Sequence, residues 1–115
     1  MPVLKVFTVN YGGIRIKVKV LPTVADVHRE HQDVARRCRP GSVVMAFFLP
    51  AQRAARHVGT IVLPLDKRLP EFIPHEVTHA VLHKMGGVLS ADDEKFATAV
   101  GRLTASIHRK IGAVA

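Results

Sequence analysis

Apolar and basic residues alternate strictly over residues 14–20 (IRIKVKV). This period of two predicts a β-strand that buries one face and exposes the other to solvent. Residues 3–9 are rich in β-forming side chains, and residues 10–13 (NYGG) between the two segments have the composition of a turn. The beginning of the chain is therefore predicted to be a β-hairpin.

A helical pattern follows this hairpin. Residues 23–26 (TVAD) have the form of a capping box, and apolar residues then recur on one helical face until residues 40–41 (PG) end the helix. His28 and His31 lie three residues apart on this face. They share it with valines, which favours structural histidines over a metal-binding pair.

Two apolar runs predict two further strands. Residues 42–49 (SVVMAFFL) are almost continuously apolar, which is typical of a central strand, and residues 57–63 (HVGTIVL) form the second run. Two helices are expected after them. The first carries three histidines and ends at residues 86–87 (GG), and the second begins at Ser90 and continues toward Ile111.

The resulting order, β-β-α-β-β-α-α, predicts an α+β fold in which helices cover a small sheet. A length of 115 residues fits one domain over residues 1–115, and a composition of 48% apolar and 23% charged residues is ordinary for a globular protein.

The charge and the N-terminal sequence bear on partners and location. Seventeen Lys and Arg against nine Asp and Glu give a formal net charge of +8, which suggests nucleic acid as a partner. The basic residues are scattered and no nucleic-acid-binding motif accompanies them, so this alternative is not favoured. No signal peptide is recognisable, and no run reaches the roughly 20 apolar residues of a membrane helix. We expect a cytoplasmic protein without membrane contact.

The candidate chemistry lies in residues 73–87 (IPHEVTHAVLHKMGG), where residues 75–79 fit the pattern H-E-x-x-H. On a helix, His75 and His79 lie on one face about one turn apart, so both imidazoles can reach one ion. Zn²⁺ suits them because it accepts nitrogen ligands in tetrahedral geometry. Glu76 is about 100° round the helix, too far to be a third ligand on that face. It is near enough to take a proton from an attacking water.

Two neighbouring residues refine the prediction for this helix. Pro74 precedes His75 directly, and because proline is favoured in the first turn, we expect the helix to begin close to Pro74. His83 extends the series to the eighth position, about 12 Å along the axis from His75. It is therefore expected to be a neighbour of the site and not a ligand. The competing interpretation is a core helix with incidental histidines.

A catalytic zinc site needs a third protein ligand. Asp92, Asp93 and Glu94 stand at the start of the last helix, where acidic residues also suit the helix dipole. Asp93 is in addition the expected cap partner of Ser90. Glu94 is favoured as the ligand, with Asp93 as the runner-up, because small residues share its face and would let the two helices lie close. These residues are Ala97, Thr98, Gly101 and Ala105.

The segment HEVTHAV resembles the zinc helix of the gluzincin metallopeptidases, the thermolysin-like group whose third ligand is a glutamate on the following helix. Residues 94–101 (EKFATAVG) are similar to that glutamate helix, and the resemblance covers about residues 73–104. It implies that His75, His79 and Glu94 are zinc ligands and that Glu76 is the catalytic general base. Thr98 stands where many members carry an aspartate that hydrogen-bonds the first histidine.

The resemblance also implies a small zincin-like fold, in which an antiparallel edge strand lines the cleft and pairs with an extended peptide. We expect residues 57–63 to be this strand and the two C-terminal helices to carry the metal. The implied activity is that of a zinc-dependent endopeptidase acting on a peptide or protein substrate. Tyr11, His57 and His108 are the candidates for stabilising the oxyanion.

Two other functions stay open at this point. The first is a non-catalytic, zinc-binding protein-interaction module, which would use a fourth protein ligand such as His83 or Asp93. The second is a basic, nucleic-acid-associated protein.

Overall fold

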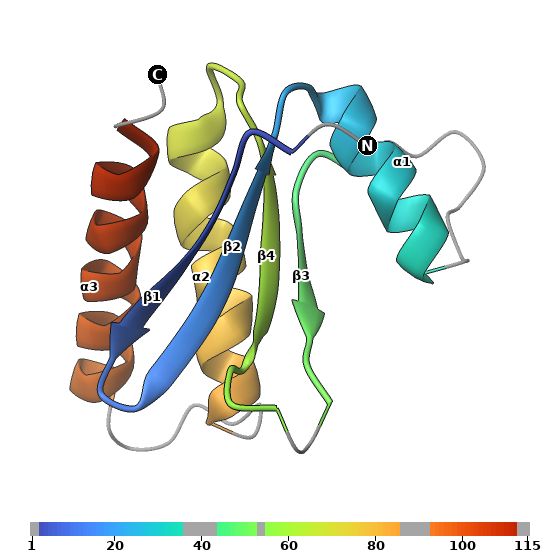
Figure 1. Ribbon diagram of the computed structural model, residues 1–115. Coiled ribbons are helices and arrows are strands. Elements are labelled where there is room, and N and C mark those ends of the chain that lie inside the picture. The colour runs from blue at the N-terminus through green and yellow to red at the C-terminus, as the bar shows by residue number, and fades with distance from the viewer. Residues whose placement is uncertain (1–2, 36–43, 53–54, 86–92, 113–115) are drawn as a thin grey trace.

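The computed structural model describes residues 3–35, 44–52, 55–85 and 93–112. Within this part of the chain a four-stranded mixed sheet is accompanied by three helices, and the predicted α+β class is confirmed (Figure 1). The elements in chain order are β1 (Lys5–Tyr11), β2 (Ile14–Leu21), α1 (Val24–Ala35), β3 (Phe47–Pro50), β4 (Gly59–Pro64), α2 (Leu69–Lys84) and α3 (Asp93–Gly112).

The strands lie in the order β1-β2-β4-β3 within the sheet. β1 and β2 are antiparallel, β2 and β4 are parallel, and β3 is antiparallel to β4. Two predictions are therefore wrong: β4 is central, although residues 57–63 were expected at the edge, and β3 is the edge strand, although residues 42–49 were expected in the centre. β3 is nevertheless apolar because its first two side chains pack on opposite faces of the sheet, whereas Leu49 and Pro50 are exposed. Phe47 belongs to the core beside α1, and Phe48 packs against the core beneath α2.

The predicted β-hairpin is confirmed, with a tighter turn than expected. Tyr11 pairs with Ile14, so only Gly12 and Gly13 form the loop, with φ angles of +55° and +80°. Positive φ at both central residues is the geometry of a two-residue hairpin turn, which glycine adopts without strain.

The alternation along β2 divides the two faces of the sheet. α2 and α3 cover one face of the sheet (Figure 1), and Ile16, Val18 and Val20 are fully buried in the larger core on that face. The basic residues between them alternate with these buried positions and therefore belong to the other face. That second face carries a smaller core next to α1, formed by Leu21, Val27, Phe47 and Val62.

α1 is fixed at its beginning and through its middle. The N-cap part of the predicted capping box is confirmed, because the backbone N–H of Asp26 donates to Thr23 Oγ1 at 3.1 Å. The reciprocal contact runs between the two side chains, with the Thr23 hydroxyl donating to Asp26 Oδ2 at 2.8 Å. Further along, His28 Nδ1 accepts the N–H of Val44 at 3.1 Å, and the His31 ring meets the edge of Phe47 at 5.0 Å between centroids. These histidines therefore attach α1 to the segment that leads into β3.

α2 begins at Leu69, more than a turn before the predicted start at Pro74. Pro70 occupies the first turn, where its missing N–H has no intrahelical partner to lose, and Pro74 lies inside the helix. The Asp66 side chain accepts the N–H of Arg68 at 2.9 Å in the turn before the helix. His75 and His79 consequently lie well inside α2 and not at its beginning.

α3 packs through the predicted apolar stripe, in which Leu103, Ile107 and Ile111 are buried together with Ala99. The predicted cap at Ser90 and the predicted stop at residues 86–87 lie outside the described residues. Among the helices described, none is long and apolar enough to cross a membrane.

Gly59 in β4 tests how tightly β3 is held. A Cβ at this position would lie 2.4 Å from the Leu49 carbonyl oxygen and 2.6 Å from the Phe48 ring. Because a backbone atom cannot move aside easily, Gly59→Ala should lower the free energy of unfolding by about 1–3 kcal/mol in urea denaturation.

Gly101→Ala is the matched control, since a Cβ there meets nothing within 4 Å on an exposed helical position. It should raise the free energy of unfolding by about 0.5–1 kcal/mol. Equal effects of the two substitutions would contradict the packing of β3 on β4.

Candidate metal centre

The packing of α2 fixes which of its side chains reach solvent. Ile73, Val77, Ala80 and Val81 are fully buried against the sheet and α3. The opposite positions carry His75, His79 and His83, all of which are exposed. This burial fixes the rotation of α2 about its own axis, so the three histidines form a stripe on its solvent-exposed side.

His75 and His79 converge at their Nε2 atoms, which lie 3.2 Å apart. The rings meet edge to face, with centroids 4.8 Å apart and planes at 78°. Two zinc–nitrogen bonds at a tetrahedral angle would separate the nitrogens by about 3.3 Å. The pair thus already has the spacing of two ligands on one ion, and one imidazole can equally donate a hydrogen bond to the other.

Glu76 completes a group of three at this point. Its Oε2 lies 3.9 Å from His75 Nε2, and one ligand atom from each of His75, Glu76 and His79 lies within 4.8 Å of the others. This group can hold a metal ion. The carboxylate is closer to the imidazoles than the angle of about 100° round the helix led us to expect.

The environment of Glu76 sets its protonation. The residue is only 5% exposed and is the one charged residue that is buried among those described. Burial raises the pKa of the Glu76 carboxyl above its ordinary value of 4.5, because the charged form loses water. His75 and His79 lower the pKa by a smaller amount. Glu76 therefore holds a proton more readily than a carboxylate in water.

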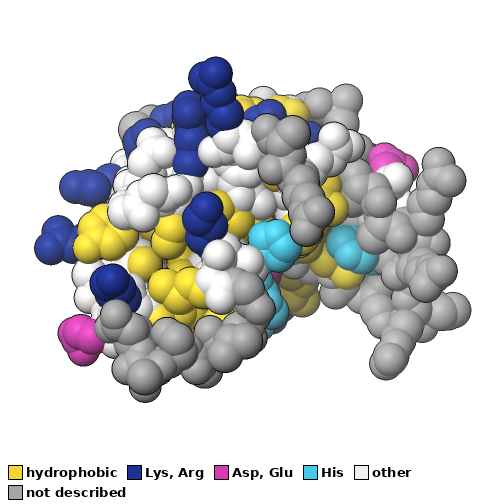
Figure 2. Space-filling view, turned by 90° about the horizontal axis from the view of Figure 1, so that it is seen from below, with side chains coloured by type: hydrophobic (Ala, Val, Ile, Leu, Met, Phe, Trp, Pro, Cys, Tyr) yellow, Lys and Arg dark blue, Asp and Glu magenta, His cyan; other side chains and the backbone are white. Residues whose placement is uncertain are grey.

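A hollow of about 460 Å³ separates α2 from the edge strand at this site. Ala46, Phe48 and Pro50 line it from the strand side at alternating positions, and His83 lines it from α2, with its ring 5.8 Å from that of Phe48. His83 is thus the predicted neighbour of the pair. An antiparallel edge strand does line the hollow, but it is β3. Figure 2 shows histidine side chains gathered beside apolar surface on this face.

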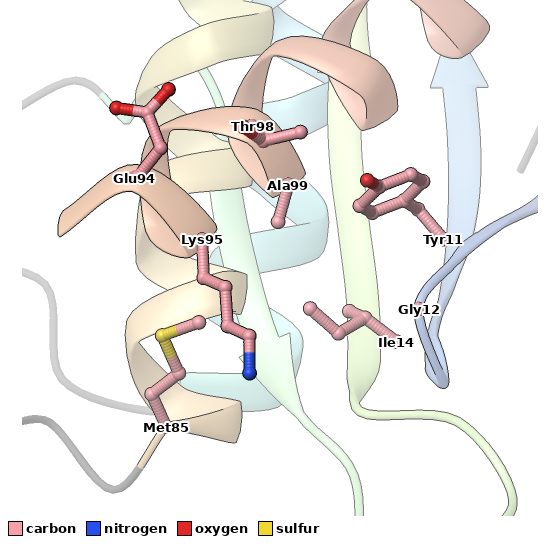
Figure 3. A pocket seen from close by; sticks show the side chains of 8 residues that line it. All are labelled: Tyr11, Gly12, Ile14, Met85, Glu94, Lys95, Thr98 and Ala99. Carbon is pink, nitrogen blue, oxygen red and sulfur yellow. The ribbon is translucent and has the colours of Figure 1, made fainter. Parts of the chain in front are cut away.

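Glu94 lies elsewhere. It is exposed in the first turn of α3 and lines a separate cavity of about 590 Å³ together with Tyr11 and Thr98. Its carboxylate points away from Tyr11 (Figure 3) and is not part of the group formed by the two imidazoles and Glu76. The structure therefore does not bring Glu94 to the histidines, and Thr98 does not line their hollow.

The reason is the face through which α3 packs. Ala97, Gly101 and Ala105, which share the face of Glu94, are exposed, whereas the contact with the core uses Ala99 and its stripe. α2 and α3 do lie side by side, but the expectation that they pack through this face of small residues is wrong. Asp92 and the side chain of Asp93 lie outside the described part of the chain.

The three residues suggested for the oxyanion are also dispersed. Tyr11 lines the cavity of Glu94, and His108 is exposed on α3. His57 lines a third hollow, which within the described part of the chain shares only His83 with the hollow of the histidine pair. Of the described histidines, only His83 joins His75 and His79 in their hollow. The signal for His83 was present in the sequence, because it lies one turn beyond His79 on the same stripe.

Comparison with known proteins gives no match, whether to a protein-family model, to a curated protein or to a solved structure. The fold and the site together define a small α+β protein with a His-Glu-His group that can hold a metal ion.

The raised pKa of Glu76 predicts a pH-dependent effect on stability in metal-free protein. Below pH 4.5 the carboxyl is protonated both in the folded and in the unfolded chain. As the pH rises from 4.5 through the raised folded pKa, the unfolded chain loses the proton first, so the free energy of unfolding falls. Glu76→Gln cannot lose a proton and avoids this fall.

The variant should therefore gain stability relative to the wild type as the pH rises from 4 to 7, as measured by urea unfolding with chelator present. Titrating groups that do not interact with Glu76 are common to both proteins and cancel in the difference, whereas the coupling of Glu76 to His75 and His79 is part of what is measured. If the difference in the free energy of unfolding between variant and wild type stays constant or shrinks as the pH rises, the raised pKa of Glu76 is contradicted.

Proposed function

We propose that the protein is a zinc-dependent endopeptidase. The observation that carries the proposal is the convergence of His75 and His79, with Nε2 atoms 3.2 Å apart, beside a buried carboxylate. The three groups face a hollow at the open edge of a sheet. An edge strand has unpaired backbone groups with which an extended peptide can pair.

Zinc is the metal that the donor set favours, since neutral imidazole nitrogens at tetrahedral spacing suit Zn²⁺ better than Mg²⁺ or Ca²⁺, which prefer oxygen. When bound, such an ion acts as a Lewis acid toward a carbonyl and promotes the ionisation of water. His75 and His79 hold and orient it from one side of α2.

Glu76 serves as the proton carrier in this proposal. Its carboxylate accepts the proton of the attacking water and delivers it to the leaving amine. The raised pKa supports this role, because a base works best when its pKa approaches the working pH. His83, which lines the same hollow, is in a position to donate a hydrogen bond to the carbonyl oxygen of a bound peptide.

Two carboxylates compete for the role of third protein ligand. The resemblance to gluzincins implies Glu94, whereas the carboxylate closest to the imidazoles is that of Glu76. If Glu76 binds the ion, it cannot act as a free base, and the site would be structural. If a carboxylate from the start of α3 binds the ion, Glu76 is released for proton transfer.

Metal content separates these ligand sets. Purified wild-type protein should contain about one zinc per chain, and His75→Ala and His79→Ala should each lose it, because a site of this kind needs all its ligands. Inductively coupled plasma mass spectrometry measures the content. Retention of zinc in both histidine variants would refute the site.

The acidic variants then identify the remaining ligand. Loss of zinc in Glu94→Ala but not in Asp93→Ala would assign Glu94, and the reverse result would assign Asp93. Retention in both, together with loss in Glu76→Ala, would make Glu76 the ligand. His108→Ala, on the outer face of α3, is the control for metal content.

Activity is tested by Glu76→Gln, which keeps the shape of the side chain but cannot accept the proton. The variant should retain zinc and cleave a mixture of unstructured peptides at least about 10²-fold more slowly, followed by mass spectrometry. Full activity of this variant would rule out the proposed mechanism.

A non-catalytic, metal-binding interaction module is the second candidate. It is favoured by the positions of Tyr11, His57, His108 and Glu94, all of which lie away from the hollow of the histidine pair. Zinc binding with no peptide cleavage in the wild type would support this module over the enzyme.

A further inference from the structure

A second hollow, of about 430 Å³, adjoins the first one on the other side of Glu76. The two hollows share Ala46 on the strand side and His75 and Glu76 on the helix side. Together they form one groove between the edge strand and α2, which we call the strand–helix groove. The group that would carry out the chemistry lies at its middle, so a bound peptide would place residues on both sides of it.

The second hollow combines apolar walls with one exposed acidic group. Val44, Met45 and Phe72 are partly buried and line its sides, and Glu71, in the first turn of α2, is exposed at its rim. The side chains of Lys and Arg match this arrangement, because their long hydrocarbon stems cover apolar surface while their charged ends remain at its edge.

The charge of the strand–helix groove differs from that of the whole chain. The sequence has 17 Lys and Arg against nine Asp and Glu, yet the described residues that line the two hollows include two glutamates and neither Lys nor Arg. In the view of Figure 2 most Lys and Arg side chains lie away from the histidines. A basic peptide is therefore not repelled inside the groove, and Glu71 attracts its cation.

We propose that the second hollow is a specificity pocket for a Lys or Arg side chain of an extended peptide substrate, with Glu71 as the residue that selects the positive charge. This inference rests on the proposed peptidase function. The stem of the basic residue packs on Phe72 and Met45, and its cation pairs with the Glu71 carboxylate. Because Glu71 is solvent-exposed, the pair adds a selectivity of about three- to fivefold and not more.

Peptide binding without cleavage tests the pocket. Zinc-loaded Glu76→Gln protein is titrated with three fluorescent peptides of identical sequence except for one central residue, which is Lys, its neutral analogue norleucine, or Glu. Fluorescence anisotropy should show that the Lys peptide binds about three- to fivefold more tightly than the norleucine peptide and that the Glu peptide binds most weakly. Increasing salt should reduce the preference.

Glu71→Gln, added to the same background, should abolish the preference for Lys over norleucine, and Glu71→Lys should favour the Glu peptide. If Glu71 only stabilises the start of α2, its substitution would weaken the binding of all three peptides equally and leave the ratios of their affinities unchanged. Asp33→Asn removes the same charge from an exposed position on α1 and should preserve the preference.

The outcomes separate the two proposals. Selective binding of the Lys peptide, together with a wild type that cleaves no peptide, would support the specificity pocket and contradict the endopeptidase function. Cleavage without any preference for Lys or Arg would support the endopeptidase function and contradict the specificity pocket. An unchanged preference in Glu71→Gln, or no binding of any of the three peptides, would also overturn the pocket.

Discussion

The rotation of α2 about its own axis is the constraint on which the site depends. Four-residue spacing places two histidines on one face of any helix, but it does not decide what that face meets. Burial of Ile73, Val77 and Ala80 decides it, because turning the helix would expose these side chains to water. With the apolar face fixed, the imidazoles stand beside the hollow next to β3, and their nitrogens lie at the distance of two ligands on one ion.

Glu76 is where the requirements of folding and of chemistry oppose each other. It is buried at the border of the two hollows, where an apolar residue would be less costly, and its neighbours on the helix are the two imidazoles. Residues that violate the rules for a stable core in this way are typical of functional sites. The same burial that disfavours the charge raises the pKa of the carboxyl, which lies beside the two imidazoles. The cost in stability and the proposed reactivity thus have one cause.

Local patterns in the sequence were sufficient for the hairpin, the capping box of α1 and the core stripe of α3, because neighbouring residues alone determine them. Pairing between strands was not predictable in this way. An apolar run such as that around Phe48 indicates packing on both faces of a strand, and this can occur at an edge, where Phe47 and Phe48 pack on opposite faces, as well as in the centre. The prediction that the Glu94 face of α3 packs against α2 failed for a related reason. A face of small residues can be a packing surface or a solvent face, and only the full helical stripe around Leu103 decides which.

The central claim is that one zinc ion is held between the two imidazoles of α2. Its most direct test is the position of the ion in an anomalous difference map, measured at the zinc edge from crystals grown with one equivalent of Zn²⁺. We expect a single strong peak about 2.0–2.1 Å from Nε2 of both His75 and His79. A peak elsewhere in the molecule, or none between these two atoms, would contradict the claim.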